Sequence, residues 1–450
     1  MGQTADGNPI CLLRHNCFPT GLLPHVIAAL QKAKIGGVIV GMPPPGNLLP
    51  VVPTVGDKTL RDYQVEAINA MLENRRGLVG IATGGGKTEV WIGFLLTLNP
   101  LNSLFIVPTE DSREQYIARA RDAGLDVAKL TTELTSPHLV STPQYINRHA
   151  TTDFMKQLLA QVQVLCFDEA HHVGKAPTWL AIAQNCPAIW RFGLTATPFH
   201  NPKNPYAKLE DMQLIGALGG ILVDAPVEAL QTIDVLETPD VCVVHYNAPK
   251  VTAKDNDWHI LRKRGLTENK YRNAMLVGVI QQIVEEKRKP LLLIELVSHG
   301  KRLQEYLYSE DVITAMCKGQ SESFVIGNAG IRYRFTRERI VQEFLAGDIQ
   351  AMIATTVWDE SFDLPEITDV VLGGGGKGGP SKYQKTLQRV GRALRKSDSK
   401  ETVRVWLPWD AHNGVLKYHS SCQLKALRDR RFPIKKVKYD KQSKRVSVHT

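Results

Sequence analysis

A glycine-rich segment that ends in lysine and threonine has the composition of a phosphate-binding loop. It stands between a short apolar run and a helix-forming run, and reads Ile81-Ala82-Thr83-Gly84-Gly85-Gly86-Lys87-Thr88. Backbone N–H groups in such a strand-to-helix turn can converge on a phosphate, and the helix N-terminus adds positive potential. Lys87 can reach the β- and γ-phosphates of a nucleotide, and the Thr88 hydroxyl can ligate Mg²⁺. Ile81 replaces a glycine of the general pattern, so we expect Gly84 and Gly86 to make the turn.

An acidic pair follows a predicted buried strand further along the chain. Asp168 and Glu169 open the sequence Asp-Glu-Ala-His-His, directly after the apolar run 162–167. An aspartate there can hold Mg²⁺ directly or through water, and its glutamate neighbour can polarise an attacking water. Zinc ligation by His171 and His172 is the rival interpretation, but adjacent residues point in different directions and no Cys/His cluster accompanies them. A glycine connection that binds nothing, or an Asp-Glu pair that only caps a helix, would not explain the co-occurrence of both motifs.

Strands that alternate with helices must position these residues. Several apolar runs end in short polar motifs before the next helix-forming run: Val-Pro-Thr at 107–109, Ser-Thr-Pro at 141–143 and Thr-Ala-Thr-Pro at 195–198. This alternation predicts a parallel sheet covered by helices on both faces. The carboxyl ends of its strands, where the polar motifs fall, form the edge at which ligands bind in such sheets.

A second set of motifs lies in the other half of the chain. Gln388, Arg392 and Arg395 are spaced i, i+4 and i+7, so a helix would carry them on one face. Two guanidinium groups on one helix face make a poor core but a good clamp for a γ-phosphate. The glycine-rich segment 373–379 is not predicted to be a second phosphate loop, because neither Ser nor Thr follows Lys377. A flexible loop is sufficient to explain it.

The composition is that of an ordinary globular protein. The chain has 450 residues, 43% of them hydrophobic and 22% charged, which is enough for two or three domains. Its seven cysteines are scattered and odd in number, which favours a reducing compartment over a disulfide framework. The apolar runs fall short of the ~18 residues of a membrane span, and the N-terminus lacks the pattern of a signal peptide. We therefore expect a cytoplasmic protein.

Positive charge is concentrated near the C-terminal end. The net charge is +10, and residues 425–445 contain ten Lys and Arg against Asp429 and Asp440. A polyanion would be attracted to this segment, and its binding would weaken as salt rises. Phe432 and Tyr439 favour a nucleic acid, because bases can stack on aromatic rings. The alternative is a solvated tail that only aids solubility.

The order of these motifs resembles that of the superfamily 2 helicases of the DExH/DEAH-box kind. In the first half the resemblance rests on Gly-Gly-Gly-Lys-Thr, Val-Pro-Thr, Ser-Thr-Pro, Asp-Glu-Ala-His-His and Thr-Ala-Thr-Pro. In the second half, 354–365 resembles the fifth helicase motif, with Ser361 in place of the usual glycine, and 388–395 resembles the sixth. The segment 267–273 is similar to one that precedes the second motor domain of phage and repair-type DNA helicases. The chain looks most like the phage UvsW-like helicases that act on branched DNA in recombination and repair.

This resemblance covers roughly residues 58–410 and implies an α/β fold with two tandem RecA-like parallel-sheet motor domains. The domains expected are a small N-terminal accessory module with a Pro-rich linker (1–57), motor domain 1 with the P-loop and DEAH motif (58–240), motor domain 2 (250–410) and a basic C-terminal extension (411–450). The accessory module could contact DNA or simply pack on the main body. The ATP site would take residues from both motor domains.

The cofactors implied are ATP and Mg²⁺. Residues that would bind ATP are Arg61, Gln64 (whose amide suits an adenine edge), Thr83, Gly84, Gly85, Gly86, Lys87, Thr88 and Asp363. Catalytic roles would fall on Lys87, Asp168, Glu169, Gln388, Arg392 and Arg395, and Mg²⁺ would be held by Thr88 and Asp168. Contacts to DNA, mainly to phosphates and therefore independent of sequence, would come from Pro108, Thr109, Thr142 and Thr355.

The function implied is an ATP-driven DNA helicase or translocase that unwinds or migrates forked or branched DNA in replication, recombination or repair. It would act as a monomeric motor on single-stranded, forked or branched DNA, without a membrane, in the host cytoplasm if the chain is phage-encoded. An RNA helicase is a second hypothesis, although 450 residues leave little room for the long C-terminal modules of cellular DEAH RNA helicases. A nucleotide-gated binding module without hydrolysis is a third, and the presence of Lys87, Glu169, Arg392 and Arg395 argues against it.

Overall fold

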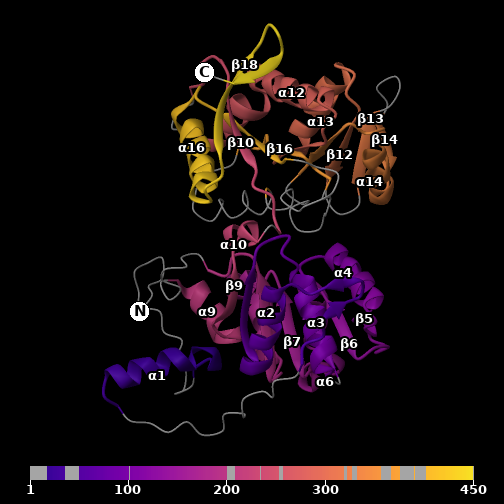
Figure 1. Ribbon diagram of the computed structural model, residues 1–450, viewed down its shortest axis with the longest axis vertical. Helices are drawn as coiled ribbons and strands as arrows, with labels where there is room; N and C mark the ends of the chain where they lie inside the picture. The colour runs from indigo at the N-terminus through magenta and orange to yellow at the C-terminus, as the bar shows by residue number, and fades with distance from the viewer. Residues whose placement is uncertain are drawn as a thin grey trace. The chain divides into compact units, whose positions relative to one another are not determined.

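A computed structural model shows that the chain folds into two compact units. They comprise Met1–Ala229 and Leu230–Thr450, and each has its own sheet and hydrophobic core (Figure 1). The structure describes residues 18–35, 50–100, 102–199, 208–233, 235–252, 257–318, 322–326, 332–355, 366–375, 390 and 402–448. In this part of the chain, the helices are too short or too polar to cross a membrane.

The first unit is built on a seven-stranded sheet in which every neighbouring pair is parallel. The strand order is β5-β6-β4-β7-β8-β3-β9. The strands are β3 (Arg76–Ile81), β4 (Ser103–Ile106), β5 (Val127–Lys129), β6 (His138–Ser141), β7 (Val164–Asp168), β8 (Trp190–Thr195) and β9 (Ile221–Ala225). The central strands are almost continuously buried, as expected for a parallel sheet covered on both sides.

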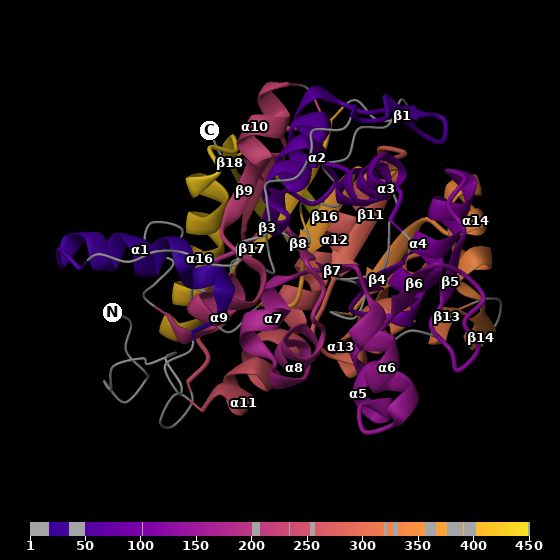
Figure 2. The ribbon, with the colours of Figure 1, turned by 90° about the horizontal axis from the view of Figure 1, so that it is seen from below.

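Helices cover both faces of this sheet (Figure 2). One face carries α2 (Asp62–Asn74), α3 (Lys87–Leu98) and α4 (Glu110–Asp122). The other carries α5 (Pro143–His149), α6 (Asp153–Gln161), α7 (His171–Lys175), α8 (Pro177–Asn185) and α9 (Leu209–Leu218). The alternation of strands and helices predicted from the sequence is confirmed for this unit.

The N-terminal segment packs on the first unit through a close backbone approach. It contains the 3₁₀ helix η1 (Thr20–Leu22), α1 (Leu23–Lys32) and the small hairpin of β1 (Thr54–Val55) and β2 (Lys58–Thr59). A Cβ added to Gly21 would lie 1.9 Å from the carbonyl oxygen of Ile215 in α9, so only glycine fits there. Leu22 is buried in the core of the unit. Packing on the main body is therefore the role that the structure gives to η1.

The second unit holds a mixed sheet of ten strands. Their order is β14-β13-β12-β15-β11-β16-β17-β10-β18-β19. The strands are β10 (Asp240–His245), β11 (Pro290–Leu293), β12 (Thr314–Lys318), β13 (Glu322–Ile326), β14 (Arg332–Phe335), β15 (Ala351–Ala354), β16 (Asp369–Leu372), β17 (Arg404–Trp409), β18 (Ile434–Asp440) and β19 (Arg445–Val448). Every neighbouring pair from β12 across to β18 in this order is parallel, as predicted. Antiparallel strands continue the sheet beyond both ends of this range, with β13 and β14 beside β12 and with β19 beside β18. Short connections between successive strands permit only antiparallel pairing there.

Helices of the second unit pack against its ten-stranded sheet. They are α11 (Trp258–Leu261), a π-helical turn (Arg262–Thr267), α12 (Lys270–Glu285), α13 (Val297–Tyr308), α14 (Arg337–Ala346) and α16 (Gly414–Asp429). Buried side chains of α12 and α13 share one core with the sheet. The short helix α10 (Val227–Thr232) spans the division between the two units.

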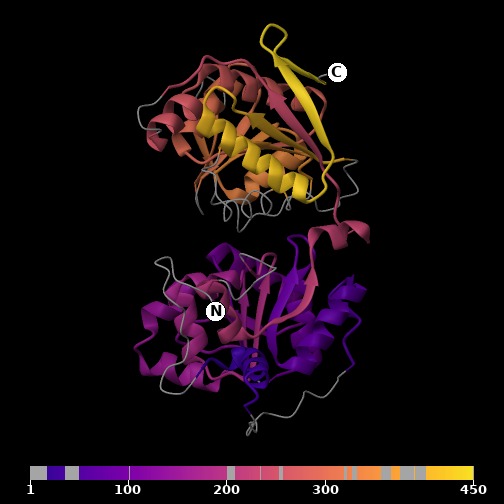
Figure 3. The ribbon, with the colours of Figure 1, turned by 90° about the vertical axis from the view of Figure 1, so that its left-hand side faces the viewer.

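The basic C-terminal segment belongs to the second unit, which corrects its description as an extension. Figure 3 shows α16 lying across the sheet and the hairpin of β18 and β19, all in yellow. β18 pairs with β10, and its Val437 and Tyr439 point into the core. Phe432 and Tyr439 are 5% and 8% exposed, so neither ring is available for base stacking. Composition concealed the alternation of apolar and basic residues that marks β18 as a half-buried strand.

Candidate active site

The motifs of the first unit meet at the carboxyl ends of its strands. Because β7, β8 and β3 are neighbours, Asp168, Thr195 and the loop that follows Ile81 leave the sheet side by side. This is the edge where ligands bind in open α/β sheets. β4 and β6 are also neighbours, and they carry Thr109 and Thr142 just beyond their ends.

The glycine loop turns through left-handed backbone at two positions. Gly84 has a φ of +88° and Gly86 a φ of +82°, a region that other residues rarely adopt. Between them, the Gly85 N–H donates to the carbonyl oxygen of Ala82 at 3.0 Å. A Cβ on Gly86 would lie 2.3 Å from Nε2 of Gln64, so a larger residue would also displace that amide. The structure confirms that Gly84 and Gly86 make the turn.

Lys87 begins α3, so the loop ends at a helix N-terminus as predicted. Its Nζ donates to the carbonyl oxygen of Ile81 at 3.4 Å, which folds the side chain back along the loop. Thr88 follows in the first turn of α3. Ile81 is fully buried as the last residue of β3 and therefore belongs to the core rather than to the loop. That placement explains how the chain accommodates an isoleucine where the general pattern has glycine.

Two side chains at the start of α2 support the loop. Gln64 is buried, and its Nε2 donates to the carbonyl oxygens of Gly85 (3.2 Å) and Gly86 (3.4 Å), while its Oε1 accepts the Arg61 backbone N–H (2.9 Å). The Tyr63 hydroxyl donates to the Gly85 carbonyl oxygen at 2.5 Å. Both ends of the Gln64 amide are thus bonded to backbone, and its contact with adenine stays a prediction. Sequence reasoning missed Tyr63. Its position next to Gln64 was the signal that could have identified it.

The acidic pair is half-buried at the end of β7. Oδ1 of Asp168 accepts the backbone N–H of Glu169 at 2.9 Å. Burial and the neighbouring Glu169 carboxylate raise the pKa of Asp168 from 3.8 to about 6, while the Lys87 ammonium acts in the opposite direction. The glycine loop and the acidic motif therefore share one electrostatic environment.

Glu169 has a strained backbone and a histidine partner. Its φ is +47°, a left-handed conformation that costs a non-glycine residue ~1 kcal/mol or more. Oε2 of Glu169 lies 3.4 Å from Nδ1 of His171, which lies 3.3 Å from Oγ1 of Thr195. Thr195 Oγ1 also accepts the Thr197 backbone N–H at 3.2 Å. His171 thus joins the acidic motif to the Thr-Ala-Thr-Pro motif, a role that sequence reasoning did not assign.

The residues at this edge fit Mg²⁺ rather than zinc. The Asp168 carboxylate and the Thr88 hydroxyl are hard oxygen ligands, and a cation would relieve the repulsion between Asp168 and Glu169. Within the described ranges, no three His, Cys, Asp or Glu side chains come together to hold a metal ion unaided. Nucleotide phosphates would therefore have to complete the ligand set, as is usual for Mg²⁺.

Two of the threonines predicted to contact DNA cap helices. Oγ1 of Thr109, which follows Pro108, accepts the Ser112 backbone N–H at 3.1 Å at the start of α4. Oγ1 of Thr142 accepts the Tyr145 backbone N–H at 3.4 Å at the start of α5. Each hydroxyl therefore accepts a backbone N–H within the protein, and Oγ1 of Thr109 also lies 2.8 Å from the Ser112 hydroxyl oxygen. Both contacts with DNA stay predictions.

The predicted residues of the second unit are only partly described. Asp363, Gln388, Arg392 and Arg395 lie outside the described residues, and of 388–395 the structure describes only Val390, which is helical and buried. Thr355 directly follows β15, and its buried Oγ1 has no hydrogen-bond partner among the described residues. The arginine clamp and the Thr355 contact with DNA stay predictions.

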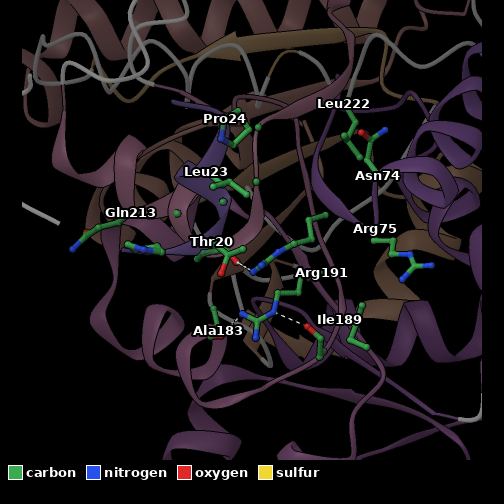
Figure 4. A pocket seen from close by; sticks show the side chains of 18 of the residues that line it. Thr20, Leu23, Pro24, Asn74, Arg75, Ala183, Ile189, Arg191, Gln213 and Leu222 are labelled. Atoms are coloured by element: carbon green, nitrogen blue, oxygen red, sulfur yellow. Dashed lines mark hydrogen bonds between the residues drawn. The ribbon is translucent and has the colours of Figure 1, made fainter. Parts of the chain in front are cut away.

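A large cavity of the first unit lies at the amino ends of its strands. Its volume is about 1230 Å³, and its lining includes the N-terminal segment and the starts of β3 and β9. Figure 4 shows Thr20, Leu23 and Pro24 among the lining side chains, together with Arg191. The Arg191 guanidinium donates to the Ala183 carbonyl oxygen at 2.6 Å. Since the strands begin here and end at the glycine loop, this cavity is separate from the candidate nucleotide site.

Both halves of the chain match known protein families. Residues 57–200 match the family described as the res subunit of type III restriction enzymes. Residues 281–397 match the helicase conserved C-terminal domain. The chain belongs to the superfamily 2 helicases. This helicase is accordingly an ATP hydrolase of the helicase and translocase class, as predicted.

The relatives of this helicase include archaeal DNA motors. It is 28% identical over 381 residues to the DNA 3'-5' translocase XPB2 of Sulfurisphaera tokodaii, across 77% of this chain and 81% of that protein. It is 24% identical to the putative DNA 3'-5' helicase Rad25 of Haloarcula marismortui, across 75% of this chain. The match spans 50% of the length of that Rad25 protein.

One of two similar solved structures shows the same fold. S. cerevisiae Dbp5 bound to RNA and ADP BeF3 has a TM-score of 0.58 at 14% identity, with 86% of this chain and 92% of that chain covered. The crystal structure of T4 UvsW covers 95% of this chain and 90% of that chain at 20% identity, with a TM-score of 0.38. The likeness to Dbp5 confirms the predicted α/β fold with two RecA-like domains.

Asp168→Asn should stabilise this helicase at neutral pH. Because folding raises the pKa of Asp168 to about 6, its favourable contribution to stability is present below about pH 4 and is lost as pH rises through 6. The uncharged variant should therefore be more stable at pH 7.5 by up to about 3 kcal/mol, a difference that shrinks as pH falls. Unfolding followed by tryptophan fluorescence at pH 7.5 and pH 5 would measure it, with the exposed Asp57→Asn as the control. An equal or lower stability at pH 7.5 would contradict the raised pKa.

Proposed function

We propose that the protein is an ATP-dependent DNA helicase or translocase that moves 3'-5' and acts as a monomer on forked or branched DNA. The observation that carries the proposal is the convergence of the glycine loop, Lys87, Asp168 and Glu169 at one edge of the sheet. The choice of DNA and of polarity is supported by the names of the archaeal relatives. The choice of branched DNA is supported by the resemblance of the motifs to the phage recombination helicases.

Each residue of the site has a distinct task in hydrolysis. The loop N–H groups and Lys87 would neutralise charge on the β- and γ-phosphates as the transition state forms. Glu169 would orient the attacking water and accept its proton. Mg²⁺, held by Asp168, Thr88 and the phosphates, would supply further charge neutralisation when bound. Gln388 and the guanidinium groups of Arg392 and Arg395 would act on the γ-phosphate from the second motor domain.

Contacts with DNA are proposed at strand ends and on the basic C-terminal segment. Thr109 and Thr142 lie at the same sheet edge as the ATP residues, so one rigid sheet would carry both sites. Lys436 and Lys438 lie on the exposed face of β18, opposite its buried side chains. Phosphate contacts by these residues would be independent of sequence and sensitive to salt. His171 lies between Glu169, the proposed water-activating residue, and Thr195 at the end of the neighbouring strand β8.

Stimulation of ATP hydrolysis by different nucleic acids tests the substrate. We expect single-stranded DNA to raise turnover at least ~10-fold over the basal rate, and forked DNA and four-way junctions to be as effective or more so. An RNA strand of the same sequence should stimulate much less. A strand-displacement assay with the 3' or the 5' arm blocked then measures polarity, and movement 5'-3' would contradict that part of the proposal.

The alternatives give different results in the same series. Stimulation by RNA alone would establish an RNA helicase and overturn the DNA proposal. Nucleotide-dependent binding of DNA without any turnover would establish a gated binding module instead. Equal stimulation by linear and branched DNA would retain the motor and reject its preference for branched substrates.

A further inference from the structure

The segment 267–273, which the proposed function leaves unused, contributes a fully buried arginine to the second unit. Arg272 is 0% exposed. Its Nε donates to Oδ1 of Asp410 at 2.8 Å, and its Nη1 donates to the carbonyl oxygen of Gly373 at 2.7 Å. Asp410 is itself 2% exposed and also accepts the Tyr246 hydroxyl at 2.5 Å. Taking a guanidinium out of water is costly, so these partners are what makes the position tolerable.

The partners of Arg272 come from the carboxyl ends of three adjacent strands. Tyr246 follows β10, Gly373 follows β16 and Asp410 follows β17, and the sheet order is β16-β17-β10. Arg272 itself bonds to the ends of β16 and β17, and Asp410 extends the link to Tyr246 at the end of β10. This is the edge of the sheet at which ligands bind in α/β folds. Gly373 also opens the stretch of sequence that leads to Gln388, Arg392 and Arg395.

The rest of the segment holds Arg272 in place. Asn269 caps α12, and its Oδ1 accepts the backbone N–H groups of Tyr271 (3.0 Å) and Arg272 (3.1 Å). Asn273 donates to the Thr267 carbonyl oxygen at 3.1 Å, and its Oδ1 lies 2.9 Å from Nε2 of His299. These bonds fix the first turn of the helix from which the guanidinium projects. The residue types at 269, 272 and 273 are therefore explained by one structure.

A second buried charge cluster of the same unit offers a natural comparison. Asp369 is 0% exposed at the start of β16, and its carboxylate accepts Nε of Arg288 (2.7 Å) and Nε of Arg404 (2.6 Å). It also accepts the indole N–H of Trp406 at 2.7 Å. This cluster lies at the amino ends of β16 and β17, away from the edge where ligands bind. It contributes to stability without touching Gly373 or Asp410.

We propose that Arg272 is a positioning residue for ATP turnover. It holds Gly373, and with it the start of the segment leading to the predicted arginine clamp, against the ends of β10 and β17. The proposal rests on the proposed ATPase function. The planar guanidinium serves acceptors from two strands at once, whereas the single ammonium of a lysine cannot reproduce that fork. Since Arg272 is fully buried and bonded to Asp410 and Gly373, its loss should change the rate of turnover rather than the binding of ATP.

The test compares Arg272→Lys with Arg288→Lys in the full chain. Both changes keep the positive charge but remove a planar guanidinium that donates to a buried carboxylate. Both should therefore lower the unfolding temperature. We expect Arg272→Lys to lower kcat for DNA-stimulated hydrolysis at least ~10-fold while KM for ATP stays within about threefold. Binding of a fluorescent ATP analogue should be equally unaffected. Arg288→Lys should keep kcat within about twofold.

Asp410→Asn separates the proposal from a general loss of stability. It should reproduce the kcat defect, and the double variant Arg272→Lys/Asp410→Asn should lose no more kcat than either single change, because both act through one contact. If Arg272→Lys does not fold, Tyr246→Phe removes only one hydrogen bond from Asp410 and should still lower kcat about threefold. A kcat within twofold of wild type in the folded Arg272→Lys variant, or an equal loss in Arg288→Lys, would overturn the proposal. A wild-type protein without ATP hydrolysis would instead refute the proposed function.

Discussion

Lys87→Ala should abolish nucleic-acid-stimulated ATP hydrolysis, with turnover reduced at least ~1000-fold. The ammonium stands at the N-terminus of α3 and is held back along the loop by the Ile81 carbonyl oxygen. It is the side chain of the described site that can place a positive charge on the β- and γ-phosphates. Its removal leaves the developing charge to the backbone N–H groups alone, and also removes the opposing effect on the pKa of Asp168. Steady-state hydrolysis at saturating DNA would measure the loss.

Two controls separate this effect from misfolding. The far-ultraviolet circular dichroism of Lys87→Ala should match that of the wild type, because the Lys87 side chain is only half-buried. Lys156→Ala, an exposed lysine of α6, should turn over ATP at the wild-type rate. Normal turnover in Lys87→Ala would show that the glycine loop does not bind the phosphates of the hydrolysed nucleotide.

Local patterns were sufficient to predict the elements that carry the site. The apolar spacing of Val65, Ile68, Met71 and Leu72 predicts a helix, and α2 indeed spans Asp62–Asn74. The glycines of the loop and the lysine that ends it specify a strand-to-helix turn, which the structure confirms. These features are readable because the residues involved are close in sequence and their backbone conformations are restricted.

Contacts between distant segments could not be predicted in the same way. The sequence does not predict that the Gln64 amide bonds to Gly85 and Gly86, which follow β3 whereas Gln64 precedes it. The Arg272–Asp410 pair joins residues 138 positions apart, and no local pattern marks Asp410 as its partner. The composition of the C-terminal segment favours stacking of a base on Tyr439. The pairing of β18 with β10 instead places this ring in the core. In each case the sheet topology decides the partner.

Glu169→Gln should lower kcat by ~100-fold to 10,000-fold and leave the affinity for ATP intact. Glutamine has nearly the shape of glutamate and can occupy the same left-handed backbone, so the loop should be undisturbed. It cannot accept the proton of the attacking water. Rapid-quench measurement of single-turnover hydrolysis, together with equilibrium binding of ATP, would separate the chemical step from binding. Glu133→Gln, an exposed loop residue of the same unit, is the matched control.

The electrostatics of the acidic pair predict a second effect of Glu169→Gln, on the pH dependence of ATP binding. Because the Glu169 carboxylate raises the pKa of Asp168, its neutralisation should let the pKa of Asp168 fall towards its ordinary value. Asp168 would then be ionised at a lower pH, and Mg²⁺-dependent binding of ATP should persist to a lower pH in Glu169→Gln than in wild type. A variant that merely misfolds would lose binding at every pH. A loss of ATP affinity as large as the loss of turnover would show that Glu169 binds the nucleotide rather than activating water.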